Sequence, residues 1–318
     1  MSDQSASSKT VIVTGGAGFI GSHLADAFIA EGWQTHVLDD MSGGRLENIP
    51  EAATLHKLDI RSTEAHQLIL DLKPQVLVHQ AAQMDVRRSV ADPGFDADVN
   101  IRGTLNLLEA CRQAGTDQVL FASTGGAIYG EQDSFPADEE HAQRPVSPYG
   151  VSKLSVERYL FFYHQAYGLN VACMRYANVY GERQNPHGEA GVVAIFLQRL
   201  LAGDSCRING DGLQTRDYVH VSDVVRANLA AVGQKGFHTF NVGTGRETNV
   251  VQLYEQLAES VGVAEKAAHG PGMPGEQRRS VITPKKIQDE LGVPEPIDIQ
   301  EGFQRTADWF SARAGNKS

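Results

Sequence analysis

Short apolar runs alternate with amphipathic stretches along the first half of the chain. The apolar runs predict buried strands at residues 11–14, 35–39, 54–59, 76–79, 119–122 and 171–176. Between them, apolar positions three and four residues apart predict helices at 19–31, 63–72, 99–113 and 151–167, the first of which is closed by Gly32. Because alternating strands and helices are typical of βαβ units, we expect an α/β fold: a doubly wound, Rossmann-type parallel sheet with helices on both faces.

The pattern changes after Tyr176. A polar loop at 181–191 and a tight turn at 209–212 flank a predicted helix at 192–201, and a loop rich in Gly and Pro is expected at 267–275. Further helices are predicted at 222–231, 249–261, 284–291 and 299–314, with one strand at 239–242. The chain has 318 residues, which suggests about two domains. We expect residues 1–178 to form the first domain and 179–318 a smaller C-terminal α/β domain, with segments near 219–250 returning to the first domain.

The charge balance narrows the classes of partner. With 28 Lys and Arg against 39 Asp and Glu, the formal net charge is −11, which disfavours nonspecific binding to nucleic acid or to an anionic membrane. No apolar run approaches the ~18 residues of a membrane span, and the polar opening has no signal-peptide core. Three cysteines without CxxC spacing and eleven histidines without HxH or HxxH spacing predict no metal site. We therefore expect a cytoplasmic protein.

A glycine-rich segment lies between the first predicted strand and the first predicted helix. It satisfies GxGxxG at Gly16, Gly18 and Gly21, and GxxGxxG when Gly15 replaces Gly16. Such glycines let the backbone approach a pyrophosphate that sits at the helix N-terminus, although a plain glycine-rich turn has the same pattern. The second strand ends in Asp39, near the offset at which an acid binds the ribose hydroxyls and repels a 2′-phosphate. The combination predicts a dinucleotide site that prefers NAD.

Tyr149 and Lys153 lie four residues apart, which places a phenol and an ammonium group on one face of a predicted helix. A nearby cation lowers the pKa of a phenol from about 10, which favours its action as a proton acceptor near neutral pH. Surface residues of an amphipathic helix show the same spacing by chance. Together with the glycine motif, however, the pair resembles the extended short-chain dehydrogenase/reductase family, and within it the nucleotide-sugar 4-epimerases. The resemblance extends from Val11 to about Phe310.

The resemblance implies roles for individual residues. Tyr149 is expected to be the general base on the sugar C4 hydroxyl, with Lys153 holding the nicotinamide ribose and polarising Tyr149. Asp59 and Ile60 match the pair beside the adenine. The residues that match the cofactor-binding positions are Gly15, Gly18, Phe19, Ile20, Gly21, Asp39, Asp59, Ile60, Gln80, Ala81, Ala82, Asn100, Ser123, Tyr149, Lys153 and Tyr176.

The loop after the fifth strand departs from the family pattern. Members carry a Ser or Thr four residues before a Tyr-Gly pair, and this chain is one residue longer there. Counting from the strand gives Thr124 as the catalytic hydroxyl, whereas counting back from Tyr129 gives Gly125; we choose Thr124, with Ser123 close to the cofactor and Gly125 close to the sugar. Related dehydratases have an Asp-Glu pair after the Thr, but this chain has no carboxylate until Glu131. The absence of that acid and base favours epimerisation.

The second half matches the substrate side of the family. Arg216 and Arg278 correspond to arginines that contact the diphosphate, although Arg279 is adjacent to Arg278 and the choice between them stays open. Glu276 corresponds to an acid that holds the nucleotide ribose, and Asn178 to an asparagine that touches the sugar nucleotide.

Ser280 suggests a preference among sugars. A bulky tyrosine at the matching position restricts some 4-epimerases to plain hexoses, and a small residue there admits a 2-acetamido group. Ser280 therefore predicts UDP-GlcNAc/UDP-GalNAc interconversion, with UDP-Glc/UDP-Gal also accepted, unless loop insertions shift the register. The expected activity is C4 epimerisation of a UDP-hexose through a transient 4-keto sugar.

Two alternatives remain open, and the expected assembly is a homodimer. A UDP-glucuronate 4-epimerase would need a cation near C6, for which Arg87 and Arg88 are candidates; a non-catalytic NAD(H)-sensing regulator would not need Tyr149 and Lys153. The family dimerises through two helices, here residues 99–113 and 151–167. Residues that either form that face or pack on the sheet are Leu105, Leu107, Leu108, Leu160, Phe161 and Phe162.

Overall fold

The computed structural model describes residues 9–186, 191–272 and 277–315. Its largest element is a parallel sheet of seven strands in the order β11-β6-β5-β4-β1-β2-β3. The strands are β1 (Thr10–Thr14), β2 (Gln34–Asp39), β3 (Thr54–Lys57), β4 (Val76–His79), β5 (Gln118–Thr124), β6 (Asn170–Tyr176) and β11 (Phe237–Val242). This order reverses between β1 and β4, and in such doubly wound sheets ligands bind at the carboxyl ends of the two strands beside the reversal. The predicted Rossmann-type fold class is confirmed.

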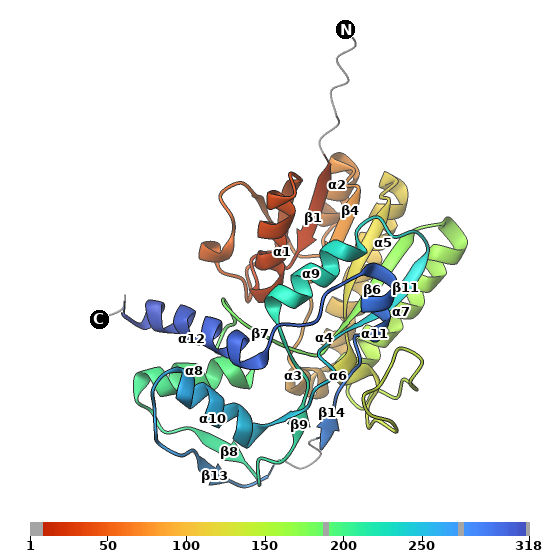
Figure 1. Cartoon of the computed structure of the whole chain (residues 1–318). Helices are drawn as coiled ribbons and strands as arrows, with labels where there is room; N and C mark the ends of the chain where they lie inside the picture. The colour runs from red at the N-terminus through yellow and green to blue at the C-terminus, as the bar shows by residue number, and fades with distance from the viewer. Residues whose placement is uncertain (1–8, 187–190, 273–276, 316–318) are drawn as a thin grey trace.

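Helices cover both faces of the sheet (Figure 1). On one face, α1 (Phe19–Ala30), α9 (Val221–Ala231) and α11 (Lys285–Leu291) pack on the apolar side chains that the strands direct to that side. On the other face, α2 (Thr63–Leu72), α5 (Thr104–Ala114) and α7 (Pro148–Tyr167) form a second core with the alternate side chains. Successive strand residues point to opposite faces, so strands buried on both sides are apolar throughout, as the sequence pattern indicated.

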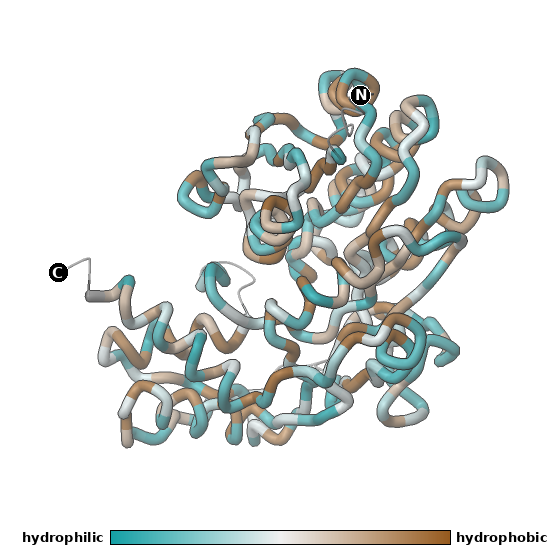
Figure 2. Tube along the Cα trace, turned by 45° about the horizontal axis from the view of Figure 1, so that its top comes forward, coloured by the Kyte–Doolittle hydropathy of each residue, from teal (hydrophilic) through white to brown (hydrophobic). Residues whose placement is uncertain are grey.

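A separate core lies below the sheet in the view of Figure 1. It is formed by α8 (Val192–Ala202), α10 (Val250–Ser260) and α12 (Ile299–Gly315), with the short strands β8 (Arg207–Asn209) and β13 (Ala268–Gly270) at its edge. Figure 2 shows hydrophobic segments gathered inside both parts of the molecule. Segments after β6 belong to both parts, because β11 joins the edge of the main sheet and α9 packs on its face.

Asp217 connects the two parts. It lies between β9 (Thr215–Arg216), which pairs with β12 (Thr248–Asn249) and β14 (Arg279–Ser280), and β10 (Tyr218–His220), which pairs with β7 (Asn178–Tyr180). Its buried carboxylate accepts hydrogen bonds from the backbone N–H and hydroxyl of Thr244, from Gly245 N–H, and from Ile282 N–H at 3.3 Å. Burial raises the pKa of Asp217 to about 6. One side chain thus joins three segments that are distant in sequence.

Several local predictions differ from the structure. The helix expected at 99–113 is preceded by α3 (Val86–Ala91) and α4 (Pro93–Ala97), and its first part is the π-helical segment η2 (Asp98–Gly103). Short helices also form at η1 (Leu46–Asn48) and α6 (Gly125–Ile128), and β13 lies in the predicted loop 267–275. Helix α7 begins at Pro148 rather than at 151, because Ser147 caps it by accepting from Gly150 N–H and proline suits the first helical position.

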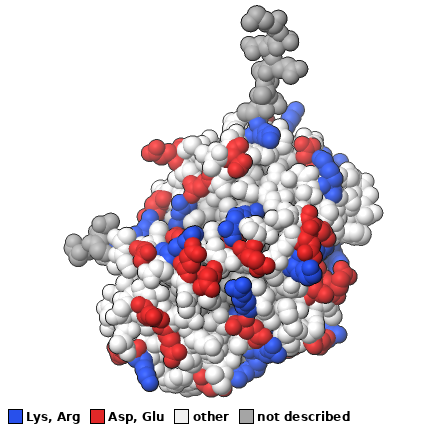
Figure 3. All heavy atoms as spheres, in the orientation of Figure 1, with Lys and Arg blue, Asp and Glu red and all other residues white. Residues whose placement is uncertain are grey.

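Charged side chains of both signs are interspersed on the face seen in Figure 3. None of the helices in the described ranges has the length and apolar character needed to cross a bilayer.

A buried ion pair fixes α7 against β5 and β6. Arg175 on β6 and Glu157 on α7 are each only 2% exposed, and the guanidinium donates to both carboxylate oxygens, at 3.1 and 2.7 Å. Arg175 also donates to the Tyr129 hydroxyl at 3.0 Å, and Ser123 donates to Glu157 at 2.5 Å. The network therefore holds the carboxyl ends of β5 and β6 and the segment after β5 relative to one helix.

Removing one member of this pair should be costly. We expect Glu157→Gln to lower the free energy of unfolding by about 3 to 5 kcal/mol, because it leaves the Arg175 charge buried without compensation. Glu109→Gln is the matched control, since Glu109 pairs with Arg112 on the surface of α5 and should leave stability nearly unchanged. Urea unfolding at neutral pH measures both, and equal effects of the two substitutions would contradict the prediction.

Candidate active site

The glycine-rich turn forms a close approach between the carboxyl ends of β1 and β4. Gly15 has φ +66°, donates its N–H to Leu38 O at 2.8 Å, and a Cβ on it would lie 2.8 Å from Ala81 N. A Cβ on Gly21 would lie 2.2 Å from Gly15 O. Only glycine fits at both positions, so the turn stays tight and the backbone remains exposed to a ligand along it.

Helix α1 begins at Phe19, directly after this turn. Its N-cap, Gly18, has no side chain to bond the first N–H groups, which are those of Phe19, Ile20 and Gly21. Free N–H groups and the positive end of the helix dipole suit a phosphate. The sequence and the local geometry therefore agree on where a pyrophosphate would bind.

Asp39 closes the other side of this turn. It is 7% exposed and accepts hydrogen bonds from Ala17 N–H at 3.0 Å and Met41 N–H at 2.8 Å. Burial raises its pKa, and the two backbone bonds partly oppose that rise. The carboxylate is held in place at the end of β2, as a ribose-binding acid must be, so the residues present fit a dinucleotide without a 2′-phosphate.

A chain of buried hydrogen bonds lies beneath the end of β4. Thr14 Oγ1 and His79 Nδ1 are 2.7 Å apart, and His79 Nε2 and Thr104 Oγ1 are 2.8 Å apart. Thr104 gives its hydroxyl proton to Asn100 O, so His79 must carry its proton on Nε2 and accept from Thr14. Burial and the charge of Lys153 lower the pKa of His79 to about 3, so the ring is neutral and structural.

The segment after β4 meets β6 on the opposite side. Gln80 Nε2 donates to the Tyr176 hydroxyl at 3.1 Å, and Asn228 Nδ2 on α9 donates to the same oxygen at 2.9 Å. Burial raises the pKa of Tyr176 to about 12. The structure thus brings together Gln80 and Tyr176, both of which match cofactor-binding positions of the family, and adds Asn228. Ala82, two residues after Gln80, is half-buried.

Asp59 and Asn100 already have protein partners. Arg61 binds both carboxylate oxygens of Asp59, at 2.9 and 3.0 Å from its Nε, which lowers the pKa of Asp59. Ile60 is buried, and its Cδ1 would lie 2.7 Å from a Cβ placed on Gly103. The side-chain amide of Asn100 accepts from Gln83 N–H and donates to Gln83 O, both at 2.9 Å. These side chains shape the cofactor side of the site through the loops they hold.

Tyr149 and Lys153 occupy the first turns of α7. Lys153 is buried, its Nζ donates to Ala122 O at 2.8 Å and lies 4.7 Å from the centre of the Phe121 ring and 5.9 Å from that of Tyr149. Burial lowers the pKa of Lys153 to about 8, against the charges of Asp96 and Glu157, which raise it. The pair is therefore assembled at the carboxyl end of β5.

The pKa of Tyr149 differs from the sequence-based expectation. Burial raises it, and the charge of Asp96 raises it further, whereas the pattern had suggested that Lys153 lowers it. The Lys153 ammonium lies 5.9 Å from the centre of the Tyr149 ring, and desolvation of the phenolate is the largest cause of the rise in the pKa of Tyr149.

The two hydroxyls at the end of β5, those of Ser123 and Thr124, have different partners. Thr124 Oγ1 accepts from Ala127 N–H at 3.2 Å and so caps α6, while Ser123 donates to buried Glu157 rather than toward a cofactor. A Cβ on Gly126 would lie 3.8 Å from both Thr124 Oγ1 and Asn178 Oδ1. Thr124 and Asn178 therefore border one space that the glycine leaves open.

Gly125 lies against the strand that carries Ser280. A Cβ on Gly125 would lie 2.6 Å from Ile282 Cδ1, two residues beyond Ser280. Ser280 is 4% exposed and pairs with Arg216 in the parallel strands β14 and β9. Arg278 lies directly before β14, and its backbone C=O accepts from Thr215 N–H at 2.9 Å, next to Arg216.

The two adjacent arginines have different partners. Arg279 binds Glu247 on both oxygens and stacks on Phe135 at 3.7 Å, whereas Arg278 makes looser contacts with Asp211 at 3.2 to 3.5 Å. Arg216 donates to its neighbour's carbonyl, Thr215 O, at 2.8 Å. Glu276 lies outside the described residues.

Sequence reasoning missed several buried polar residues around this site. They are Asp96, Glu157 and Asn228, all on helices, and Asp217. A polar residue inside an amphipathic helical pattern normally indicates the solvent face, so no signal in the pattern marked the helical ones.

Comparisons with known proteins agree with this geometry. Residues 11–243 match the model of the NAD dependent epimerase/dehydratase family. The UDP-glucose 4-epimerase of Mycolicibacterium smegmatis is 44% identical over 305 residues, covering 94% of this chain and 97% of that protein.

Three solved structures are also similar. The UDP-glucose 4-epimerase of Thermotoga maritima with UDP-glucose has a TM-score of 0.93 at 44% identity, with 96% of this chain and 99% of that one covered. The Thermus thermophilus UDP-glucose 4-epimerase with NAD has a TM-score of 0.90 at 44% identity and covers 95% and 98%. A UDP-N-acetylglucosamine 4-epimerase from Methanobrevibacter ruminantium, with UDP-N-acetylmuramic acid, has a TM-score of 0.90 at 31% identity. The match covers 96% of this chain and 99% of that one. With the family model over most of its length and these relatives, the chain belongs to the NAD dependent epimerase/dehydratase family.

Proposed function

We propose that this protein interconverts UDP-hexoses at C4 by an NAD-dependent, redox-neutral epimerisation. The observation that carries the proposal is the placement of Tyr149 and Lys153 on the first turns of α7, at the same edge of the sheet as the glycine turn and Asp39. The names of the similar proteins support the same activity. A non-catalytic NAD(H) sensor would need the glycine turn but not the half-buried Tyr149 and the buried Lys153.

NAD, when bound, would supply a positively charged ring as the reversible hydride acceptor for C4 of the sugar. Tyr149 takes the proton of the C4 hydroxyl on its phenolic oxygen as the 4-keto sugar forms, and gives it back when the hydroxyl is restored. Lys153, charged near neutral pH, stabilises the phenolate and donates to the ribose hydroxyls. Thr124 lies beside the glycine-lined space and donates to the reacting oxygen, while Ser123 supports the loop through Glu157.

Epimerisation requires the sugar to turn over while the nucleotide stays bound. We assign the diphosphate to Arg216 and to Arg278, whose backbone C=O bonds to Thr215 beside Arg216, and the nucleotide ribose to Glu276. Gly125 and Asn178 border the sugar. In this assignment residues 1–178 form the NAD-binding domain and 179–318 the UDP-sugar domain, with 219–250 returning to the first.

The alternative substrate considered for this site carries a carboxylate. Arg87 and Arg88 were the candidates for a carboxylate-bearing substrate such as UDP-glucuronate, but Arg88 stacks on Phe95 at 4.0 Å, which does not favour that alternative.

We also propose a cytoplasmic location, because all three cysteines are free and buried.

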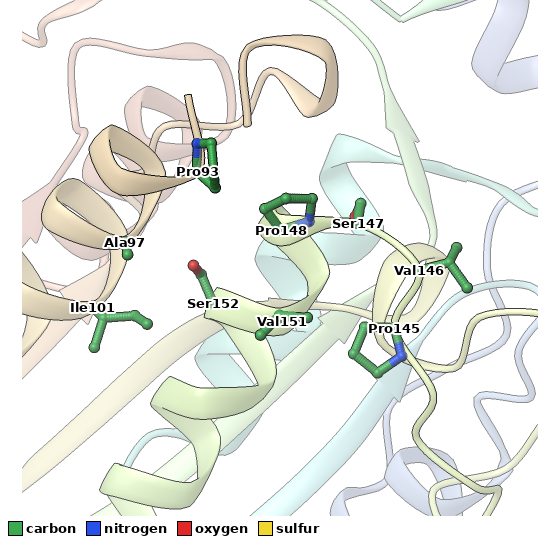
Figure 4. Close-up of a pocket in the computed structure, with 9 residues that line it drawn as sticks. All are labelled: Pro93, Ala97, Ile101, Pro145, Val146, Ser147, Pro148, Val151 and Ser152. Carbon is green, nitrogen blue, oxygen red and sulfur yellow. The ribbon is translucent and has the colours of Figure 1, made fainter. Parts of the chain in front are cut away.

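The homodimer is assigned to the outer face of α7. An apolar groove of about 500 Å³ lies between α4, η2 and the start of α7 (Figure 4). Ala97, Ile101 and Val151 line it, and Phe162 is exposed further along the helix. Of the residues expected there, Leu107, Leu108 and Leu160 instead pack on the sheet, which was their competing use, and the ring of Phe161 contacts Phe237.

The activity is tested with a panel of UDP-sugars, reading the C4 configuration by proton NMR. We expect Tyr149→Phe to lower kcat by about 10² to 10⁴, because the general base is lost, without loss of bound NAD. Tyr159→Phe, on the exposed side of the same helix, is the control and should match the wild type. The proposal is wrong if the wild type converts no UDP-sugar, accumulates NADH with turnover, or is unaffected by Tyr149→Phe.

The sugar preference is tested at Ser280. We expect Ser280→Tyr to reduce kcat/KM for UDP-GlcNAc by roughly a hundredfold and to change that for UDP-glucose far less, because the added ring would occupy the space of the acetamido group. Ser280→Ala should retain both activities, and a thermal melt checks that each variant folds. Equal loss or equal retention of the two substrates in a folded Ser280→Tyr variant contradicts the pocket assignment.

The dimer is tested at Phe162, which is 51% exposed. We expect Phe162→Glu to halve the mass measured by light scattering, because a charge in an apolar interface is costly to desolvate. Leu46→Glu, which alters an exposed apolar residue of η1, should leave the mass unchanged. A monomeric wild type, or a dimeric Phe162→Glu variant, excludes this interface.

A further inference from the structure

Asp96 is a carboxylate of α4 with no exposed surface. Its Oδ1 accepts from Gln83 Nε2 at 3.1 Å and from Asn100 Nδ2 at 3.0 Å, and its Oδ2 accepts from the Ser152 hydroxyl at 2.6 Å. All three hydrogen bonds are donated to Asp96. A buried carboxylate with hydrogen bonds on both oxygens therefore lies close to the proposed proton-transfer pair.

The three partners come from three different segments. Gln83 belongs to the loop after β4, Asn100 to η2, and Ser152 to the second turn of α7, from which it points toward α4 (Figure 4). Asn100 also clamps the backbone of Gln83. Asp96 therefore fixes the loop that follows the cofactor edge of β4 relative to the helix turn that carries Tyr149 and Lys153.

The charge of Asp96 acts on both members of that pair. It raises the pKa of Tyr149 and opposes the lowering of the pKa of Lys153 by burial. The other charged or titratable groups around the pair are Glu157 on α7 and neutral His79 on β4. Helix α3, which also packs on α7, directs Arg88 onto Phe95.

We propose that Asp96 is a positioning residue for proton transfer: it tethers α7 to the loop after β4 and holds a fixed negative charge next to Tyr149 and Lys153. This inference rests on the proposed function. The same charge stabilises the ammonium that Tyr149 needs and disfavours the phenolate, so Asp96 sets the pH range in which the pair works.

Two substitutions separate the charge from the tether. In Asp96→Asn the amide oxygen can accept from Gln83 and Asn100 while the amide nitrogen donates to Ser152, so the charge is lost and the shape is kept. Ser152→Ala removes one tether and keeps the charge. Asp98→Asn is the matched control, because this carboxylate lies two residues away but pairs with Arg61 at 2.7 Å and with Arg102.

We expect Asp96→Asn to move both limbs of the pH profile of kcat/KM to lower pH by about half a unit or more. The sign follows because loss of a negative charge lowers the pKa of a phenol and of an ammonium alike. Ser152→Ala should lower kcat several-fold with unmoved limbs, and Asp98→Asn should match the wild type. Asp96→Asn limbs that coincide with those of the wild type overturn the charge role, and an unchanged kcat in Ser152→Ala overturns the tether.

A measurement without turnover distinguishes failure of this inference from failure of the proposed function. The ring Cζ of Tyr149 is followed by NMR in protein carrying ¹³C-labelled tyrosine and bound NAD, and is assigned by comparison with Tyr149→Phe. We expect its titration to begin at lower pH in Asp96→Asn than in the wild type. Identical titration curves overturn the inference even if the enzyme is active, and a shifted curve supports it even if no UDP-sugar is converted.

Discussion

Lys153 and Glu157 attach α7 to the carboxyl ends of β5 and β6, and Tyr149 lies four residues before Lys153 on the same helix. Lys153 bonds to a buried carbonyl near the end of β5, and Glu157 binds Arg175 on β6. A helix presents residues four apart on one face, so a single helix delivers the base, the cation and the buried ion pair to the same edge of the sheet. Because Arg175 and Glu157 are out of water, the pair persists only in one geometry. The placement of the proposed chemistry follows from that constraint.

The elements that could be predicted from sequence are those whose pattern is local. Strand β1 and helix α1 were placed within about one residue, since a buried parallel strand is apolar throughout and Gly32 ends the helix. The glycine turn and the Tyr149–Lys153 spacing were equally visible. The π-helical segment before α5 and the strand β13 were not, because the first depends on packing around Asn100 and the second on a partner strand that is distant in sequence.

The burial of several polar side chains also could not be predicted from the sequence. Asp96 and Glu157 interrupt apolar patterns in a way that normally marks the solvent side, and only the fold reveals that their partners come from other segments. The same limit explains the pKa of Tyr149. Spacing alone gives the sign of the Lys153 effect, but the sign of the net shift depends on desolvation, which the sequence does not contain.

The proposed substrate side needs open space, whereas the proposed catalytic side needs rigidity. In the proposed mechanism the proton-transfer pair must be rigid, whereas a hexose that turns over needs space. The segments assigned to the sugar side are glycines and short two-residue strands. Asp217 reconciles the two, because it holds the segments after β11 and β14 next to β9 by accepting from the backbone N–H groups of Thr244, Gly245 and Ile282. Firm backbone and open side-chain space are thereby combined at one point, which is the property that a tethered, rotating substrate requires.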